Sequence, residues 1–180
     1  MAVTKSEPAA PPPQPSIGVP ALAVVSGSLL SGAMISLSAF VVPVFLDTNT
    51  DAGHMLRQWA RLYHYGHIYL PALCIATCGL YGYAALRKRA ASSYSPQWPR
   101  YAAAAAATLA MVPFTWYVMM PTNDVLFGLE AAATAGTGSP ELVAVRALVV
   151  KWAWLHVTRS LSPLVGAFLG FTGLLRELGL

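Results

Sequence analysis

The sequence has few charged residues: Asp, Glu, Lys and Arg make up 10% of its 180 positions, whereas 56% are hydrophobic. Soluble domains carry roughly a quarter charged residues, so this chain lacks the polar surface that water requires. Its mean hydropathy of +0.56 indicates the same. We therefore expect lipid to cover much of the protein.

Cysteine is also scarce, with Cys74 and Cys78 four positions apart inside an apolar segment. A redox pair usually has the spacing C-x-x-C, and a structural zinc site needs more ligands. The spacing disfavours a membrane quinone redox protein of the vitamin K epoxide reductase type. We interpret both cysteines as small packing residues.

Nucleotide-binding motifs and nucleophile elbows are absent from the sequence. The net charge of +4 comes without a basic stripe interleaved with exposed aromatics, so we expect no nucleic-acid partner. If the chain is an enzyme, we expect it to work without a tightly bound organic cofactor.

Long apolar runs are the dominant feature that is present, and each is long enough to cross a bilayer as a helix. They cover residues 19–46, 67–86, 101–120 and 154–175. The pattern predicts an all-α fold, a four-helix transmembrane bundle that forms one four-span membrane domain over residues 18–180. Residues 1–17 are rich in Pro and Ala and predict a disordered tail.

Two polar connections are expected on one side of this bundle. The first covers residues 47–66 and includes a short interfacial helix over 55–65. The second covers residues 122–140, after Pro121 has closed the third span. Ser139 is expected to cap the last helix.

Small residues at spacings of four mark two stripes on the first span. One stripe holds Ser28, Gly32 and Ser36, and the adjoining one holds Ala23, Gly27 and Ser31. Such stripes let helices approach closely in lipid, so we expect the first span to be packed against its neighbours.

Basic residues are more numerous on the side of the two termini. That side holds Lys5, Arg87, Lys88, Arg89, Arg100 and Arg176. By the positive-inside rule, both termini are expected in the cytosol. The sequence thus predicts a multi-pass integral membrane protein, which we assign to the endoplasmic reticulum or a related endomembrane.

Polar and ionisable residues gather at the opposite end of the predicted bundle. They are His54, His64, His67, Asn123, Asp124, His156 and Arg159. Such residues are costly near a membrane and usually mark a site. We expect this end to be functional.

Trp152, His156 and Arg159 stand at i, i+4 and i+7, so they share one face of the last helix. An aromatic wall, a titratable imidazole and a fixed cation suit a planar, acidic, phenolic substrate. The alternative is that they are headgroup anchors at a helix end. Asn123 offers an amide to a substrate oxygen or to dioxygen, or else serves as a helix-cap or turn residue.

Histidine spacing leaves two further options open. His64 and His67 stand three apart and, with His156, would make three metal ligands. His67 and His156 would alternatively face each other across a haem. Our prediction is that the site holds no metal.

Two segments together resemble the anthrone oxygenase family of fungal polyketide pathways. They are Met120-Pro121-Thr122-Asn123-Asp124 and Lys151-Trp152-Ala153-Trp154-Leu155-His156-Val157-Thr158-Arg159. Members of that family are small multi-span proteins with an Asn after the third span and a W-x-x-L-H-x-x-R-like element entering the fourth.

The resemblance implies a cofactor-independent monooxygenase that uses molecular oxygen to oxidise an anthrone to an anthraquinone. It implies that His156 is the base and that Arg159 and Asn123 stabilise the oxyanion. Trp152 would stack on the substrate, and His67 and Asp124 are further candidates for substrate binding. Expected partners are a small aromatic polyketide and membrane lipid, with association with other pathway enzymes as an option.

A function of another class also fits the sequence. A non-catalytic membrane subunit or carrier would use the same residues to hold an aromatic polyketide. Analysis of the products formed from an anthrone separates the two.

The orientation can be tested by glycosylation. We expect an acceptor sequence inserted near Gly136 to be glycosylated in the endoplasmic reticulum, because that connection faces away from the basic side. Glycosylation of an acceptor placed between Arg87 and Arg100 would instead show that the orientation is inverted.

Overall fold

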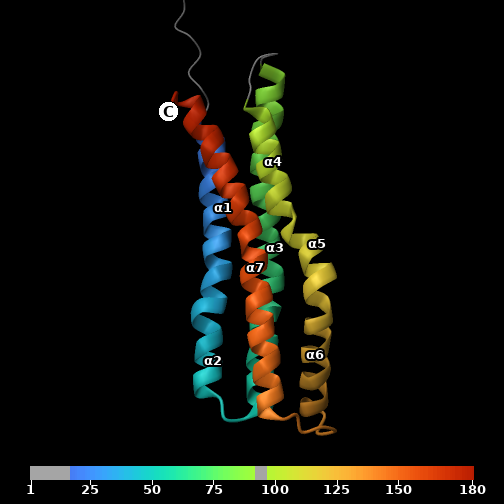
Figure 1. The fold of residues 1–180 in the computed structure, drawn as a ribbon. Helices are drawn as coiled ribbons and strands as arrows, with labels where there is room; N and C mark the ends of the chain where they lie inside the picture. Colours follow the sequence, from blue (N-terminus) through green and yellow to red (C-terminus); the bar gives the residue numbers. More distant parts are fainter. Residues whose placement is uncertain (1–16, 92–96) are drawn as a thin grey trace, which may run out of the picture.

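Apolar runs become long helical rods in the computed structural model, which describes residues 17–91 and 97–180. The first rod comprises α1 (Gly18–Ser36), the π-helical turn η1 (Leu37–Val41) and α2 (Val42–Thr48). The second rod is the single helix α3 (Ala52–Ala91). Both run the length of the molecule (Figure 1).

The third rod is interrupted more often than the others. It comprises α4 (Trp98–Leu109), α5 (Met111–Phe114), the π-helical turn η2 (Thr115–Met119) and α6 (Met120–Thr134). Figure 1 shows this rod stepping sideways at α5. The fourth rod, α7 (Leu142–Glu177), returns through the bundle.

Helix α7 is the central helix, since it packs against α1, α3, α4 and α6. Three rods are long and apolar enough to cross a membrane, namely Gly18–Thr48, Ala52–Ala90 and Trp98–Thr134. The predicted all-α membrane bundle of four helices is thus confirmed for the described residues, and the chain is a membrane protein. Helix α7 is not among the three apolar rods, so its crossing over 154–175 stays a prediction.

The predicted connection over residues 47–66 was wrong, because α3 already begins at Ala52. Asp51 explains the early start: its Oδ1 accepts a hydrogen bond of 2.7 Å from the backbone N–H of His54. This is the N-cap arrangement, which satisfies a free donor in the first turn. The expected interfacial helix over 55–65 is therefore part of α3.

The second connection was also placed wrongly. Pro121 lies at the start of α6 and does not end the rod, which continues to Thr134. A proline removes one N–H and crowds the preceding turn, and a π-helical turn directly before it accommodates this. In the same way, the π-helical turn η1 precedes Pro43 at the start of α2. Helix α7 then begins at Leu142 after the extended Glu141 rather than at Ser139.

Only one of the two small-residue stripes on α1 is packed. Ala23, Gly27 and Ser31 are buried, and Ser31 donates a hydrogen bond of 3.0 Å to the carbonyl oxygen of Ser160. The stripe that contains Ser28 and Gly32 is exposed. The expected packing of the first span is thus confirmed, and its main partner is α7. The predicted disordered tail lies, apart from Ile17, outside the described residues.

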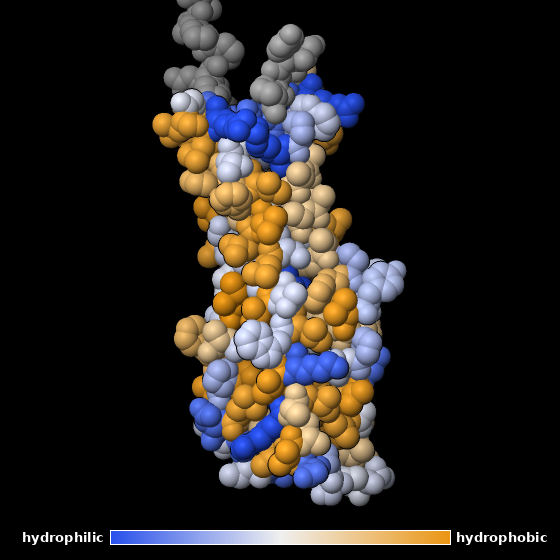
Figure 2. Space-filling view, viewed as in Figure 1, coloured by the Kyte–Doolittle hydropathy of each residue, from blue (hydrophilic) through white to orange (hydrophobic). Residues whose placement is uncertain are grey.

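Hydrophilic side chains gather at both ends of the molecule, and apolar ones cover much of the length between them (Figure 2). The start of α1 and the end of α7 lie at the same end (Figure 1). Lys88 and Glu177 join α3 to α7 there through an ion pair of 2.7 Å. Both ends of the chain's helical part are therefore on one side, as predicted.

Gly166 allows α4 and α7 to pack closely, so we expect Gly166→Ala to destabilise the protein. A Cβ at this position would overlap Thr108 Oγ1 and would lie 2.8 Å from the backbone oxygen of Ala104. Overpacking of this kind costs about 1–3 kcal/mol. Gly32→Ala is the control, since nothing lies within 4 Å of its added Cβ. Equal unfolding of the two variants in detergent would contradict this account of the packing.

Candidate active site

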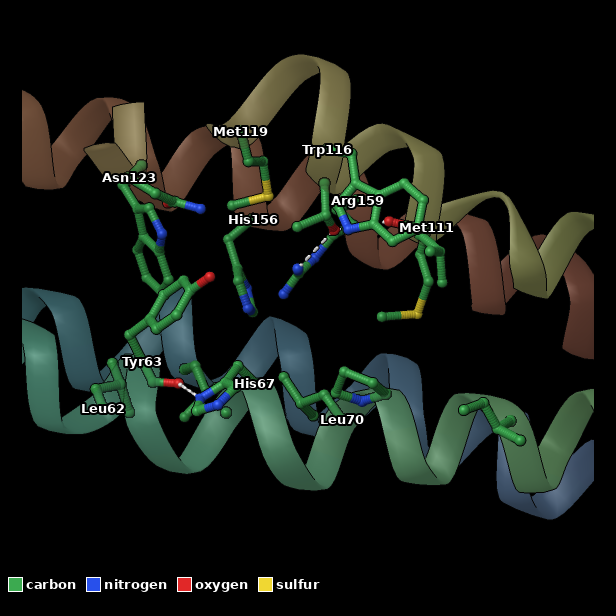
Figure 3. A pocket seen from close by; sticks show the side chains of 17 residues that line it. Leu62, Tyr63, His67, Leu70, Met111, Trp116, Met119, Asn123, His156 and Arg159 are labelled. Carbon is green, nitrogen blue, oxygen red and sulfur yellow. Dashed lines mark hydrogen bonds between the residues drawn. The ribbon is translucent and has the colours of Figure 1, made fainter. Parts of the chain in front are cut away.

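A cavity of about 400 Å³ lies between α3, the α5–η2–α6 segment and α7. Most of its lining is apolar. Its polar and aromatic lining residues include Tyr63, His67, Asn123, Trp152, His156 and Arg159. Figure 3 shows His156 and Arg159 between the α3 residues on one side and Met111, Met119 and Asn123 on the other. Five of the six predicted site residues therefore meet in one cavity.

A residue of the first rod that lies outside the cavity forms a hydrogen bond with His156. Only 1% of the residue is exposed, and its Nδ1 lies 3.3 Å from Oγ of the buried Ser38 in η1. Ser38 does not line the cavity, whereas His156 does. Because Nδ1 is hydrogen-bonded to Ser38, we assign Nε2 as the ring nitrogen that acts on a ligand.

Arg159 is fixed by the second π-helical turn. Its Nη1 donates a hydrogen bond of 2.9 Å to Oγ1 of Thr115, the first residue of η2 (Figure 3). Its Nε has no hydrogen-bond partner, and no salt bridge to it is found within residues 17–91 and 97–180. A partly buried cation that keeps free donors beside a cavity is suited to bind an anion.

Asn123 is the clearest unsatisfied group in the cavity. It is 1% exposed, and neither Oδ1 nor Nδ2 has a hydrogen-bond partner in the described part of the chain. Leaving a buried polar group unpaired costs about 1–3 kcal/mol. Because the amide lines the cavity, a ligand that both donates and accepts would satisfy it. The interpretation of Asn123 as a helix-cap or turn residue does not fit, because the residue lies inside α6.

Trp152 forms an aromatic wall next to His156, with the two ring centroids 4.8 Å apart. The indole also packs edge-on against Trp59 at 6.1 Å, and its Nε1 has no hydrogen-bond partner among the residues that the structure describes. Only 3% of Trp152 is exposed. A headgroup anchor must reach the membrane surface, so the anchor interpretation does not fit Trp152 or His156.

His67 and Asp124 differ in their placement. His67 lines the cavity and donates from Nδ1 to the carbonyl oxygen of Tyr63 at 3.1 Å (Figure 3). Asp124 is exposed and does not line the cavity. One residue turns a helix by about 100°, which directs Asp124 away from the side on which Asn123 lies. We therefore do not include Asp124 in the site.

The remaining histidines lie apart from this cavity. His54 is exposed and hydrogen-bonds to Gln58 at 3.1 Å. His64 lines a separate polar groove together with Arg57 and Arg61. Within the described ranges, no three His, Cys, Asp or Glu side chains are grouped so that they would hold a metal ion.

Sequence reasoning missed Ser38 and Thr115, which position His156 and Arg159. Neither residue belongs to a motif, and each acts because a π-helical turn places it beside α7. The available signal in the sequence was the proline a few residues downstream of each of them. A π-helical turn precedes each proline, and such turns are frequent at functional sites.

The unpaired amide predicts that Asn123→Leu is neutral or stabilising by about 1 kcal/mol, because it removes a buried polar group that lacks a partner. Asn49 is the matched control. It is also buried, but its Nδ2 donates to Phe45 O at 2.9 Å and to Gln58 Oε1 at 2.7 Å. We expect Asn49→Leu to lose about 1–3 kcal/mol in detergent unfolding. A larger loss for Asn123→Leu than for Asn49→Leu would refute a ligand-binding role for Asn123.

Comparison with known proteins gives consistent matches. The family model described as anthrone oxygenase matches residues 59–169. The chain is 67% identical over 160 residues to anthrone oxygenase nsrD of Aspergillus novofumigatus, which covers 89% of this chain and 95% of that protein. It is 51% identical over 168 residues to anthrone oxygenase dmxR16 of a Cryptosporiopsis species, covering 91% and 92%.

A relative from Claviceps purpurea, also named anthrone oxygenase, is 46% identical over 158 residues and covers 87% of this chain and 88% of its own length. No solved structure matches this protein. The family model spans the cavity-forming part of α3, the whole third rod and the α7 residues of the site. The chain belongs to the anthrone oxygenase family.

Proposed function

We propose that this protein oxidises an anthrone with molecular oxygen to the corresponding anthraquinone in polyketide metabolism. The cavity itself supports this proposal. It combines the unpaired amide of Asn123, the free Nε of Arg159 and the imidazole of His156 within apolar walls. Membership of the family supports the reaction class.

The cavity matches the chemistry of an anthrone. Three fused rings need a flat apolar space, and about 400 Å³ is within the range of small-molecule sites. Trp152 provides an aromatic face, and the phenol and carbonyl oxygens of an anthrone need polar partners. Asn123 and Arg159 supply them.

The first chemical step is proton removal. The CH₂ group between the two aromatic rings of an anthrone is acidic, because the negative charge left by loss of a proton is delocalised onto the carbonyl oxygen of the resulting anthrolate. Nε2 of His156 takes this proton, while Nδ1 stays hydrogen-bonded to Ser38. Arg159 and Asn123 stabilise the negative oxygen that results.

Oxygen then reacts with the anion without a resident cofactor. One electron passes from the anthrolate to O₂, and the resulting radical pair combines to form a C–O bond. The peroxide takes up the proton held by His156. Removal of the remaining C–H proton from this carbon then breaks the O–O bond and expels hydroxide, which leaves the new carbonyl and, with that proton, gives water. One oxygen atom enters the product and the other becomes water, so no external reductant is consumed.

The sequence pattern supports a proposal for the cellular setting. We place the protein in the endoplasmic reticulum or a related endomembrane with both termini in the cytosol, because basic residues dominate that side. Lipid then surrounds the apolar rods, and other enzymes of the same pathway are candidate partners.

Substitutions at α7 test the proposal. We expect His156→Ala to lower turnover by about 100-fold or more, the scale of a general base. Arg159→Lys should also be harmful, since an ammonium lacks the planar fork of a guanidinium. Trp152→Phe should be milder because an aromatic face remains.

His54→Ala is the control, because this histidine is exposed and does not line the cavity. Turnover per folded molecule is measured as anthraquinone formed above the spontaneous air oxidation of the anthrone. A folded His156→Ala variant as active as wild type would exclude His156 as the base, and formation of no anthraquinone by wild type would favour a carrier.

Cofactor independence makes a separate prediction. The purified protein should turn over without added flavin or NAD(P)H, and chelators should leave its rate unchanged. Stoichiometric iron, copper or haem in the active protein, with activity lost on removal, would refute this part of the proposal.

A further inference from the structure

One wall of the cavity is open toward the side of the bundle. Helices α4 and α6 pack against α3, whereas α5 and η2 between them make little contact with α3. At the end of this stretch nearer α4, Cys74 Sγ contacts the carbonyl oxygen of Thr108 at 3.6 Å. At the end nearer α6, the rings of Tyr63 and Phe127 meet edge to face at 4.9 Å.

Four cavity-lining residues border this opening, which we call the lateral window. Pro71 and Ile75 come from α3, and Val112 and Trp116 come from α5 and η2. Ile75 is 66% exposed and Trp116 is 63% exposed, although both line the cavity. The cavity therefore reaches the outer surface of the bundle between them.

Exposed aromatic residues show where this surface lies relative to a membrane. At the level of the cavity, α3, η2 and α7 expose a set of large aromatic side chains: Tyr65, Tyr69, Trp116, Tyr117 and Trp154. Tyr and Trp are enriched at membrane–water interfaces, so this set marks one interface.

The opposite interface is marked by two aromatic rings, each with an arginine guanidinium close to it. Arg87 lies 5.8 Å from the ring of Tyr83, and Arg89 lies 5.4 Å from that of Trp98. Ile75 lies between Tyr69 and Tyr83 along α3, on the hydrocarbon side of the first aromatic set. The lateral window thus faces lipid just inside an interface.

We infer that the substrate enters the cavity sideways from the bilayer, through the lateral window. The inference rests on the proposed function, which makes the ligand a flat, apolar tricycle with phenolic groups. Such a molecule partitions into the interfacial layer of a membrane, as amphipathic aromatic side chains do. The window opens next to that layer, on its hydrocarbon side, and His156 and Arg159 lie inward of it on α7.

The competing route is a polar groove on the aqueous side. It is lined by Arg57, Arg61 and His64 and shares Tyr63 and His67 with the cavity. A substrate arriving from water would pass this groove. The two routes involve different residues, so substitutions can separate them.

The experiment measures the exchange of a hydroxylated anthraquinone with protein in lipid nanodiscs; this product class lacks the CH₂ group that the proposed reaction oxidises. Ile75→Trp narrows the window and Ile68→Trp is the matched control, a lipid-exposed isoleucine of α3 that does not line the cavity. We expect Ile75→Trp to slow association by about tenfold, within the range known for variants of one site. Dissociation should slow in proportion, because a barrier hinders passage both ways.

Trp116→Ala acts on the opposite rim and should speed both rates, which keeps the test decisive if Ile75→Trp does not fold. Unchanged exchange in the folded window variants, or slowing by His64→Trp alone, would overturn lateral access. The proposed function fails separately, if wild type binds the anthraquinone but oxidises no anthrone.

Discussion

Helix α7 carries a histidine and an arginine into the interior of a bundle that is largely covered by apolar side chains. Burying such groups is costly unless neighbouring residues provide hydrogen bonds. Ser38 meets His156 from the first rod, and Thr115 meets Arg159 from the third. Both contacts are made to α7, which also packs against α1, α3, α4 and α6.

Two proline-linked π-helical turns make these contacts possible. η1 precedes Pro43 and presents Ser38, and η2 precedes Pro121 and presents Thr115. A regular helix turns by about 100° per residue, so the wider turns change which residues face α7 beyond them. η2 also belongs to the segment that departs from α3, so the turn that fixes Arg159 also contributes to the lateral window.

The sequence was sufficient to predict the helical membrane bundle, because four long apolar runs leave few alternatives. It was also sufficient to group Trp152, His156 and Arg159, since helical periodicity fixes their common face. It was insufficient to predict where α3 begins and where α6 ends. Asp51 caps α3 early, and the third rod continues past Pro121, so both helices run through polar stretches. Ser38 could not be found, because its role depends on contact between residues that are 118 positions apart.

We propose that the unsatisfied polar groups of the cavity are the binding site for the aromatic tricycle. An experimental structure with a bound hydroxylated anthraquinone tests it most directly. We expect the tricycle beside Trp152, with its oxygens within hydrogen-bond distance of the Asn123 amide and the Arg159 guanidinium, and Nε2 of His156 facing the central ring. A tricycle bound elsewhere, for example in the polar groove at Arg57 and Arg61, with Asn123 still unpaired, would contradict it.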